Sequence, residues 1–185
     1  MKAYKDIPIF PLKSIILPGG QFPLRIFERR YLDMTRDCLK NNDGFIIALT
    51  KRDSDYISSV YDYASYVEIV DWSQLDGGLL GITVEGKQIV KLSNCNLDEC
   101  NLLKGDAEEV EYGVDYLVPQ KYQILSKFYK KIYPEIKAYI FHIKPKYNDA
   151  NWLGFRLIEC LPIELNDKAD LISMQEPLDR LERIL

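Results

Sequence analysis

The residues of this chain that could do metal, redox or nucleophilic chemistry are four cysteines and one histidine. The cysteines are Cys38, Cys95, Cys100 and Cys160, and the histidine is His142. A structural zinc site needs four soft ligands, usually in two tight pairs, and this chain has no CxxC pair. We therefore expect reduced thiols, no bound metal and no cofactor.

Enzyme motifs are equally scarce. There is no GxSxG elbow, and a catalytic triad would have to use His142, whose apolar neighbours favour a structural role. A Ser-Lys dyad has no spacing rule of its own, and no serine stands out. The closest approach to a phosphate loop is the glycine cluster 77–81, but strands are expected on both sides of it, which favours a hairpin. Nothing here makes a positive case for an enzyme, and a hydrolase is only the third hypothesis.

Basic and aromatic residues alternate between residues 121 and 147, in a segment expected to be helical. Such a surface could bind single-stranded nucleic acid through backbone attraction and base stacking. The basic residues are all lysines, however, with no arginine to fork onto a phosphate. We favour a solvated lysine face opposite a buried tyrosine and isoleucine stripe, and we keep RNA binding as the alternative function.

Composition sets wider bounds on the protein. The chain has 185 residues, of which 47% are hydrophobic and 28% charged, and these proportions are typical of a globular protein. Its net charge of -4 argues against a surface built wholly for nucleic acid. No apolar run reaches the ~20 residues that cross a bilayer, and the amino terminus has no signal-peptide core, so we expect no membrane and a cytoplasmic location.

The elements that must position any site fall into two halves. The first half has a short helix, then period-two segments with tight turns, which predict a compact twisted barrel or sandwich. The expected helix is 31–40 with a stop at 41–44, and the expected strands are 45–50, 66–72, 79–84 and 88–92, with turns at 76–78 and 85–87.

The second half is predicted to be entirely helical. A stripe from Val118 to Ile143 indicates one long helix that Pro134 kinks or splits. Further helices are expected at 151–160, at 168–174 with Asn166 and Asp167 as caps, and from Pro177 to the end. The fold class is therefore α+β, with a β-rich subdomain 1–114 and a helical subdomain 115–185.

A proline-rich segment carries a family resemblance. Its parts are IPIFPL at 7–12, LPGG at 17–20 and PLRIFERRY at 23–31. It resembles the start of the Lon amino-terminal domain, the substrate-binding part of the ATP-dependent Lon proteases, in which a proline usually stands where this chain has Arg29. Later residues fit the same pattern in order: Leu75 to Gly78, Ile82 to Gly86, Trp152, Leu161, Pro162, Lys168, Leu171, Arg180 and Leu181.

The resemblance implies a PUA-like twisted β barrel followed by a C-terminal helical bundle, and a role in recognising protein or peptide substrates. Full-length Lon enzymes carry an AAA+ ATPase and a Ser-Lys peptidase after this domain, whereas the present sequence ends at Leu185. It therefore looks like a stand-alone Lon-domain protein, without ATP hydrolysis or proteolysis. Our leading hypothesis is a non-catalytic module, or adaptor, for unfolded or flexible segments.

A groove between the two halves is the natural place for such a site, because pockets favour the interfaces between subdomains. The candidate substrate-binding residues are Arg25, Phe27, Arg30, Tyr31 and Trp152. Each also has a structural interpretation: Arg30 could simply pair with Glu28, and Phe27 and Trp152 could belong to the core. The prolines and the Gly-Gly pair are expected at edge or turn positions around one end of the barrel. The sequence predicts no oligomeric state.

Overall fold

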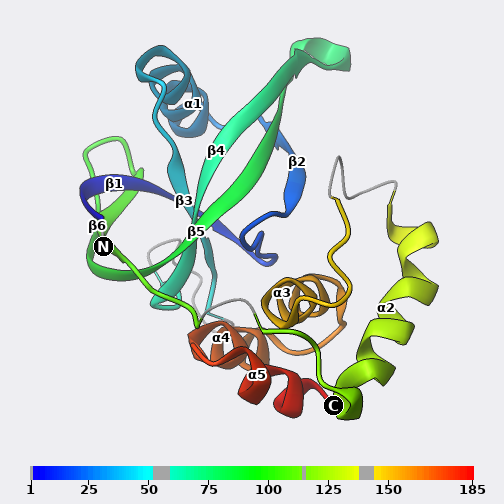
Figure 1. Cartoon of the computed structure of the whole chain (residues 1–185). Coiled ribbons are helices and arrows are strands. Elements are labelled where there is room, and N and C mark those ends of the chain that lie inside the picture. Colours follow the sequence, from blue (N-terminus) through cyan, green and yellow to red (C-terminus); the bar gives the residue numbers. More distant parts are fainter. Residues whose placement is uncertain (1, 52–58, 114–115, 138–143) are drawn as a thin grey trace.

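The structure is a computed structural model, and it describes residues 2–51, 59–113, 116–137 and 144–185. A β-rich region is followed by a group of helices, which confirms the mixed α+β class (Figure 1). The strands are β1 (Ala3–Leu12), β2 (Gln21–Ile26), β3 (Phe45–Leu49), β4 (Tyr63–Gln74), β5 (Leu80–Leu97) and β6 (Leu103–Glu109). The α-helices are α1 (Arg29–Asn41), α2 (Gln123–Ile136), α3 (Ala150–Cys160), α4 (Leu165–Ser173) and α5 (Pro177–Ile184).

The sheet has the strand order β2-β5-β4-β3-β1-β6, and β5 pairs additionally with β6. The last strand, β6, therefore pairs with β5 as well as with β1, and β5 is long enough to pair with three strands, β2, β4 and β6. Only the β1–β3 pair is parallel among the described strands. β2 stands at one end of the order and pairs with β5 alone, so its other edge has no partner strand in the described chain.

The hairpin predicted at residues 76–78 is confirmed, because a short 3-10 turn there joins β4 to β5. Gly77 and Gly78 both have positive φ, the conformation for which glycine is suited. The second turn predicted at 85–87 is wrong, since β5 continues through it, with a shift of its register against β4 between Gly86 and Gln88. A glycine suits position 86 of this strand, because the Leu17 carbonyl oxygen would be only 2.4 Å from a Cβ there.

The prolines stand where the sheet can tolerate a missing N–H. β1 changes partner at Ile9, pairing with β6 before that residue and with β3 after it. Pro8 and Pro11 therefore each lie on a stretch with one neighbouring strand, while Pro23 lies on the edge strand β2. The expected edge position is confirmed for Pro23, whereas Pro8 and Pro11 lie in β1, between β3 and β6 in the strand order.

Helix α1 agrees with its prediction to within two residues at each end. Glu28 is the N-cap residue, and Asn42 ends the helix in the left-handed conformation with φ 56°. The buried face of α1 packs on the sheet, where the rings of Phe10 and Tyr31 are 4.2 Å apart. α1 thereby covers the part of β1 that belongs to the proline-rich segment.

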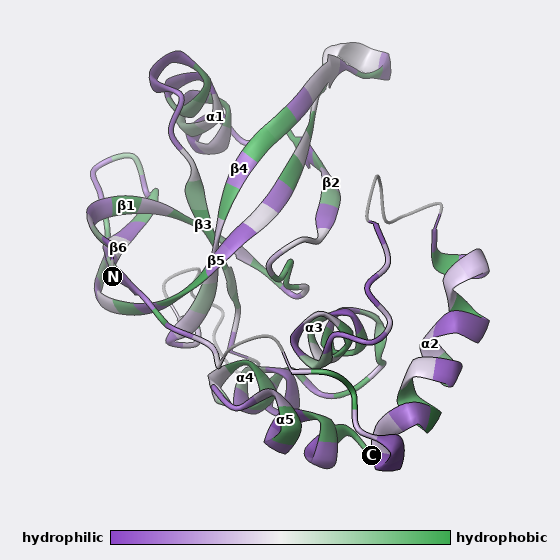
Figure 2. Cartoon of the chain, in the orientation of Figure 1, coloured by the Kyte–Doolittle hydropathy of each residue, from purple (hydrophilic) through white to green (hydrophobic). Residues whose placement is uncertain are grey.

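Helix α2 is shorter than the predicted stripe. It begins at Gln123, after Val118, and ends at Ile136, two residues beyond Pro134. The end of the predicted stripe and His142 lie outside the described residues. Hydrophobic and hydrophilic residues alternate along α2 and along the β4–β5 pair (Figure 2), as expected for elements with one buried side.

The last three helices are close to their predictions, with one correction. Asp149 caps α3, its carboxylate accepting from the Trp152 N–H at 2.9 Å. α4 begins at Leu165 with Glu164 in the N-cap position, so Asn166 and Asp167 lie inside its first turn and are not caps. Pro177 opens α5 as predicted. Among the described residues, no helix is both long and apolar enough to cross a membrane.

Candidate functional site

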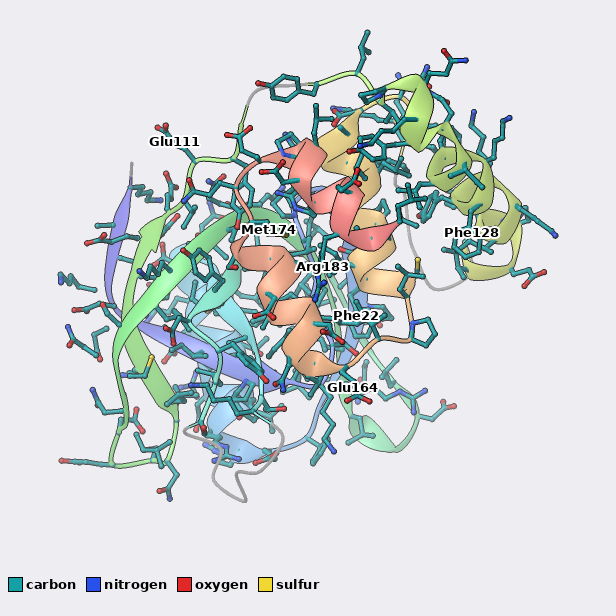
Figure 3. All side chains as sticks on the ribbon, turned by 90° about the horizontal axis from the view of Figure 1, so that it is seen from below. Phe22, Glu111, Phe128, Glu164, Met174 and Arg183 are labelled. Atoms are coloured by element: carbon teal, nitrogen blue, oxygen red, sulfur yellow. The ribbon has the colours of Figure 1, made fainter. Side chains whose placement is uncertain are left out.

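A groove of about 830 Å³ lies where the β-rich region meets the helices. Four pieces of chain form its walls: the end of β1, the end of β2 with the start of α1, the two residues after β3, and the connection between α3 and α4. Figure 3 views the molecule from below and labels Glu164, at the start of α4. The lining residues are Phe10 to Lys13, Leu24 to Glu28, Arg30, Tyr31, Thr50, Lys51 and Pro162 to Leu165.

The groove follows the edges of two strands. Successive side chains of a strand point to opposite faces, so a pocket on one face is lined by every second residue. Here three consecutive residues line the groove from each of two strands, 10–12 of β1 and 24–26 of β2, and the residue after each strand lines it as well. The groove therefore runs along the edges of β1 and β2, where backbone as well as side chains meets solvent.

Four of the five predicted site residues are brought together in this groove: Arg25, Phe27, Arg30 and Tyr31. The Phe27 side chain is 69% exposed, so the core interpretation of this residue is wrong. Arg25 is exposed as well. Because these two side chains reach into solvent at the groove, they are the ones a ligand would meet first.

Arg30 and Tyr31 form a wall of the groove. The predicted ion pair between Arg30 and Glu28 is present. Arg30 also donates from Nη1 to the Asn101 carbonyl oxygen at 2.8 Å, and its guanidinium lies 4.9 Å from the centre of the Tyr31 ring. Burial raises the pKa of the Tyr31 hydroxyl. These contacts fix both side chains in place before any ligand arrives.

Trp152 does not line the groove. It is buried among the helices, where its ring meets those of Tyr129 and Tyr147 edge-on at 5.4 and 5.8 Å. The geometry favours the core interpretation of Trp152. Conversely, sequence reasoning missed Lys13 and the α3–α4 connection as parts of the site. Lys13 lies between the first two quoted parts of the proline-rich segment, but nothing in the order of residues shows which distant loop lies near it.

A buried ion pair holds the two regions together beside the groove. The Glu159 carboxylate accepts from the Leu17 N–H at 2.7 Å and from Arg156 Nη2 at 2.8 Å. Arg156 Nη2 donates in addition to the carbonyl oxygens of Leu17 and Pro18, at 3.1 and 3.3 Å. Burial raises the pKa of the Glu159 carboxyl, and the neighbouring Arg156 opposes that rise. We call Arg156, Glu159 and the turn Leu17–Gly20 the clamp.

The described residues offer no group of side chains that could hold a metal ion. None of the four cysteines forms a disulfide in the structure. Burial raises the pKa of the Cys38 and Cys160 thiols to about 11, so both stay protonated at neutral pH. A protonated thiol is a poor nucleophile, and neither cysteine is suited to covalent catalysis.

Helix α2 contains much of the lysine-aromatic segment 121–147, for which the sequence left two interpretations open. Lys127, Lys130 and Lys131 are exposed, while Leu125 and Tyr129 on the same helix are buried. The favoured interpretation of the sequence, a solvated lysine face opposite a buried stripe, therefore describes α2. The lysines stand away from the groove, which none of them lines.

Comparisons with known proteins agree with this geometry. Residues 6–185 match the family model described as the ATP-dependent protease La (LON) substrate-binding domain. A Lon protease 3 from Sorangium cellulosum is 24% identical over 97% of this chain, and a Lon protease from Endomicrobium trichonymphae is 23% identical over the same share. The chain spans about a quarter of the length of these relatives, 23% in both cases.

Solved structures show the same fold. The crystal structure of a Lon N-terminal domain protein from Xanthomonas campestris superposes with a TM-score of 0.80 and 26% identity, covering 100% of this chain and 97% of that one. The N-terminal domain of a Mycobacterium avium complex Lon protease superposes with a TM-score of 0.66 at 16% identity, covering 99% and 96%. The whole described fold, groove included, thus lies within the matched region.

Proposed function

Because this chain belongs to the family of the ATP-dependent protease La (LON) substrate-binding domain, we propose that it is a non-catalytic module that captures segments of other proteins. The site would be the groove between β1, β2 and the α3–α4 connection. Unfolded or flexible segments are the ligand class, since a folded partner would present few chains that fit between strand edges. An adaptor role is the finer form of this proposal.

The exposed ring of Phe27 is the observation that carries the proposal. Large aromatic side chains are usually buried, and those left exposed beside a groove are typical anchors of binding surfaces. Phe27 is 69% exposed, and pre-ordered groups such as Arg30 and Tyr31 stand next to it. A rigid wall beside an aromatic anchor lowers the entropy cost of binding.

Two finer points of architecture belong to the same proposal. We infer that the sheet, whose pairings return to β5, is a PUA-like barrel. We also infer two subdomains, 1–114 and 115–185, joined by the clamp. The boundary itself falls at residues outside the described ranges. The cytoplasmic location stays a prediction.

A binding titration tests the proposal with a matched control. Fluorescence anisotropy would follow labelled, permanently unfolded model proteins titrated with the wild-type chain, with Phe27→Ala and with Phe128→Ala. Phe128 is a second exposed phenylalanine, 42% exposed on α2 and outside the groove. We expect saturable binding to the wild type, a loss of about tenfold for Phe27→Ala, and no change for Phe128→Ala.

Equal losses in the two variants would remove the groove as the site. Absence of saturable binding to any unfolded protein would remove the proposed function altogether. The nucleic-acid alternative, which the family match does not favour, would be revived by an RNA complex whose affinity falls steeply with added salt.

A further inference from the structure

The geometry points to a particular ligand and binding mode: we propose that the groove takes an extended segment with alternating apolar and acidic residues, added as a strand along the free edge of β2. This inference rests on the proposed function and names the substrate class of the same site. It follows from three features of the groove, namely its open backbone, its charge and the alternation of its walls.

The free edge of β2 presents backbone groups to the groove. The β2–β5 ladder is antiparallel and has no register shift, and Gly86 at its start donates to the Gly20 carbonyl oxygen at 2.9 Å. Alternate residues of an antiparallel strand bond to the same neighbour, so Phe22, Leu24 and Ile26 bond to β5. The backbone of Arg25 consequently faces away from β5, towards the free edge.

Pro23 limits where a new strand could pair. It has the same parity as Arg25, so its backbone faces the free edge, but proline has no N–H to donate. Proline on an edge strand commonly blocks unwanted pairing. The open part of the edge is therefore confined to the C-terminal end of β2, and this is the part that lines the groove.

The opposite wall is a second open edge. β1 pairs with β6 only as far as Ile9 and with β3 from Ile9 to Leu12. Beyond Ile9, the side of β1 that β6 occupied has no partner strand among the described residues. Residues 10–13 of this stretch line the groove. A groove lined by two open strand edges suits an extended chain, whose backbone can pair with an edge.

The charge of the groove indicates the chemistry of the extended ligand. Among its described residues the groove is lined by four basic side chains, Lys13, Arg25, Arg30 and Lys51, and by two acidic ones, Glu28 and Glu164. The whole chain, by contrast, has a net charge of -4. A groove with excess positive charge on an acidic protein favours acidic ligands and disfavours basic ones.

The period-two geometry of β2 then sets the pattern of the ligand. Leu24 and Ile26 are buried on the inner side, whereas Arg25 is exposed on the outer side. An added strand has the same alternation, because side chains of paired strands on one face are neighbours. Its inner residues would meet the apolar side and its outer residues Arg25, so apolar and acidic residues must alternate.

Synthetic peptides test this inference. Fluorescence anisotropy would compare a short peptide of alternating Val and Glu with one of alternating Val and Lys, and with two forms of the first that are N-methylated on alternate residues in one register or the other. The proteins would be the wild type, Arg25→Glu and the control Lys127→Glu. The control makes the same change of charge on α2, at an exposed position outside the groove.

We expect the wild type to bind the Val-Glu peptide at least roughly tenfold more tightly than the Val-Lys peptide. N-methylation should abolish binding in one register only, since one set of amides pairs with β2 and the other faces away. Arg25→Glu should reverse the charge preference, and Lys127→Glu should leave it unchanged.

Several results would overturn the inference. Equal affinity for the two peptides, or equal effects of the two N-methylated registers, would reject the acidic strand while leaving capture by the Phe27 groove intact. A concentration-dependent dimer in light scattering that Val-Glu peptide cannot dissociate would assign the edge to a second copy of this chain. Failure of every peptide and of every unfolded protein to bind would reject the proposed function itself.

Discussion

Two parts of one proline-rich segment differ in burial: one is enclosed by the fold and the other is open to solvent. The first, Leu17–Gly20, is pinned by the clamp, with Leu17 fully buried and its N–H and carbonyl both held by α3 side chains. The second, Leu24–Phe27, ends on an open strand edge with Phe27 largely exposed. Both halves contain large apolar residues and both contain or adjoin a proline, so these features do not separate them.

The difference lies in the contacts that each half makes with distant parts of the chain. The turn meets a helix from far along the sequence that carries the two charges needed to satisfy its backbone. The strand end meets β5 on one side and the groove on the other. We conclude that the first half is architectural and that the second half is the candidate binding surface.

Removing the acidic member of the clamp should have the largest effect on stability. Glu159→Ala leaves the fully buried Arg156 without its ion-pair partner and the Leu17 N–H without an acceptor. Breaking a buried pair in this way costs about 3–5 kcal/mol. Urea unfolding measures the loss, and Glu135→Ala, at an exposed position on α2, is the control.

The double variant Arg156→Met with Glu159→Leu should recover much of that loss, because no buried charge is then left unpaired. A loss below about 1 kcal/mol for Glu159→Ala, the range of exposed pairs, would show that the clamp does not hold the turn and would break the contrast between the two halves.

A smaller effect is expected from crowding the clamped turn. In Gly20→Ala the new methyl group would lie 2.6 Å from Glu159 Oε1 and 3.0 Å from Arg156 Nη2. Overpacking of this kind costs about 1–3 kcal/mol. Thermal and urea unfolding would measure it against Gly77→Ala, at a turn where φ is +75° and no atom lies within 4 Å.

Because Gly20 has no positive φ, its cost is steric, whereas that of Gly77 comes from backbone conformation alone and should be about 1 kcal/mol. If the cost of Gly20→Ala is unchanged in a Glu159→Ala background, which removes the nearest atom to the new methyl group, crowding against the clamp is not its cause.

The smallest change in stability should come from the open half. Phe27→Ala removes a side chain that is 69% exposed, so the free energy of unfolding should stay within about 0.5 kcal/mol of the wild type. Leu24→Ala in the same strand, at a buried position, should cost about 2–5 kcal/mol. A large loss in Phe27→Ala under urea unfolding would make this half architectural too.

Local chemistry made much of the fold predictable. Asn42 and the Asp76-Gly77-Gly78 turn carry backbone conformations that few other residues adopt, and the predictions there are confirmed. Gly86 misled because the same residue type serves a tight turn and a close backbone approach, and only the position of Leu17 distinguishes them. Asn166 and Asp167 misled because a cap residue and a first-turn residue share the same preference for the positive end of a helix.

Part of the candidate site was also predictable, because four of its residues lie close together in the sequence. The proline-rich segment pointed to Arg25, Phe27, Arg30 and Tyr31, which do line one groove. The sequence could not exclude Trp152 from the site, because an aromatic residue of a helix has the same sequence spacing whether its side chain lies in a core or contacts a ligand.

The sequence by itself determined the family, the α+β class and most of the elements, since these depend on propensities and spacings within a few residues. Only the tertiary structure decided which half of the proline-rich segment is clamped and which is left open. The physical reason is separation along the chain: the bond from the Leu17 N–H to Glu159 joins residues 142 positions apart. Exposure and strand edges are defined by such distant partners, and so is the groove that we propose as the binding site.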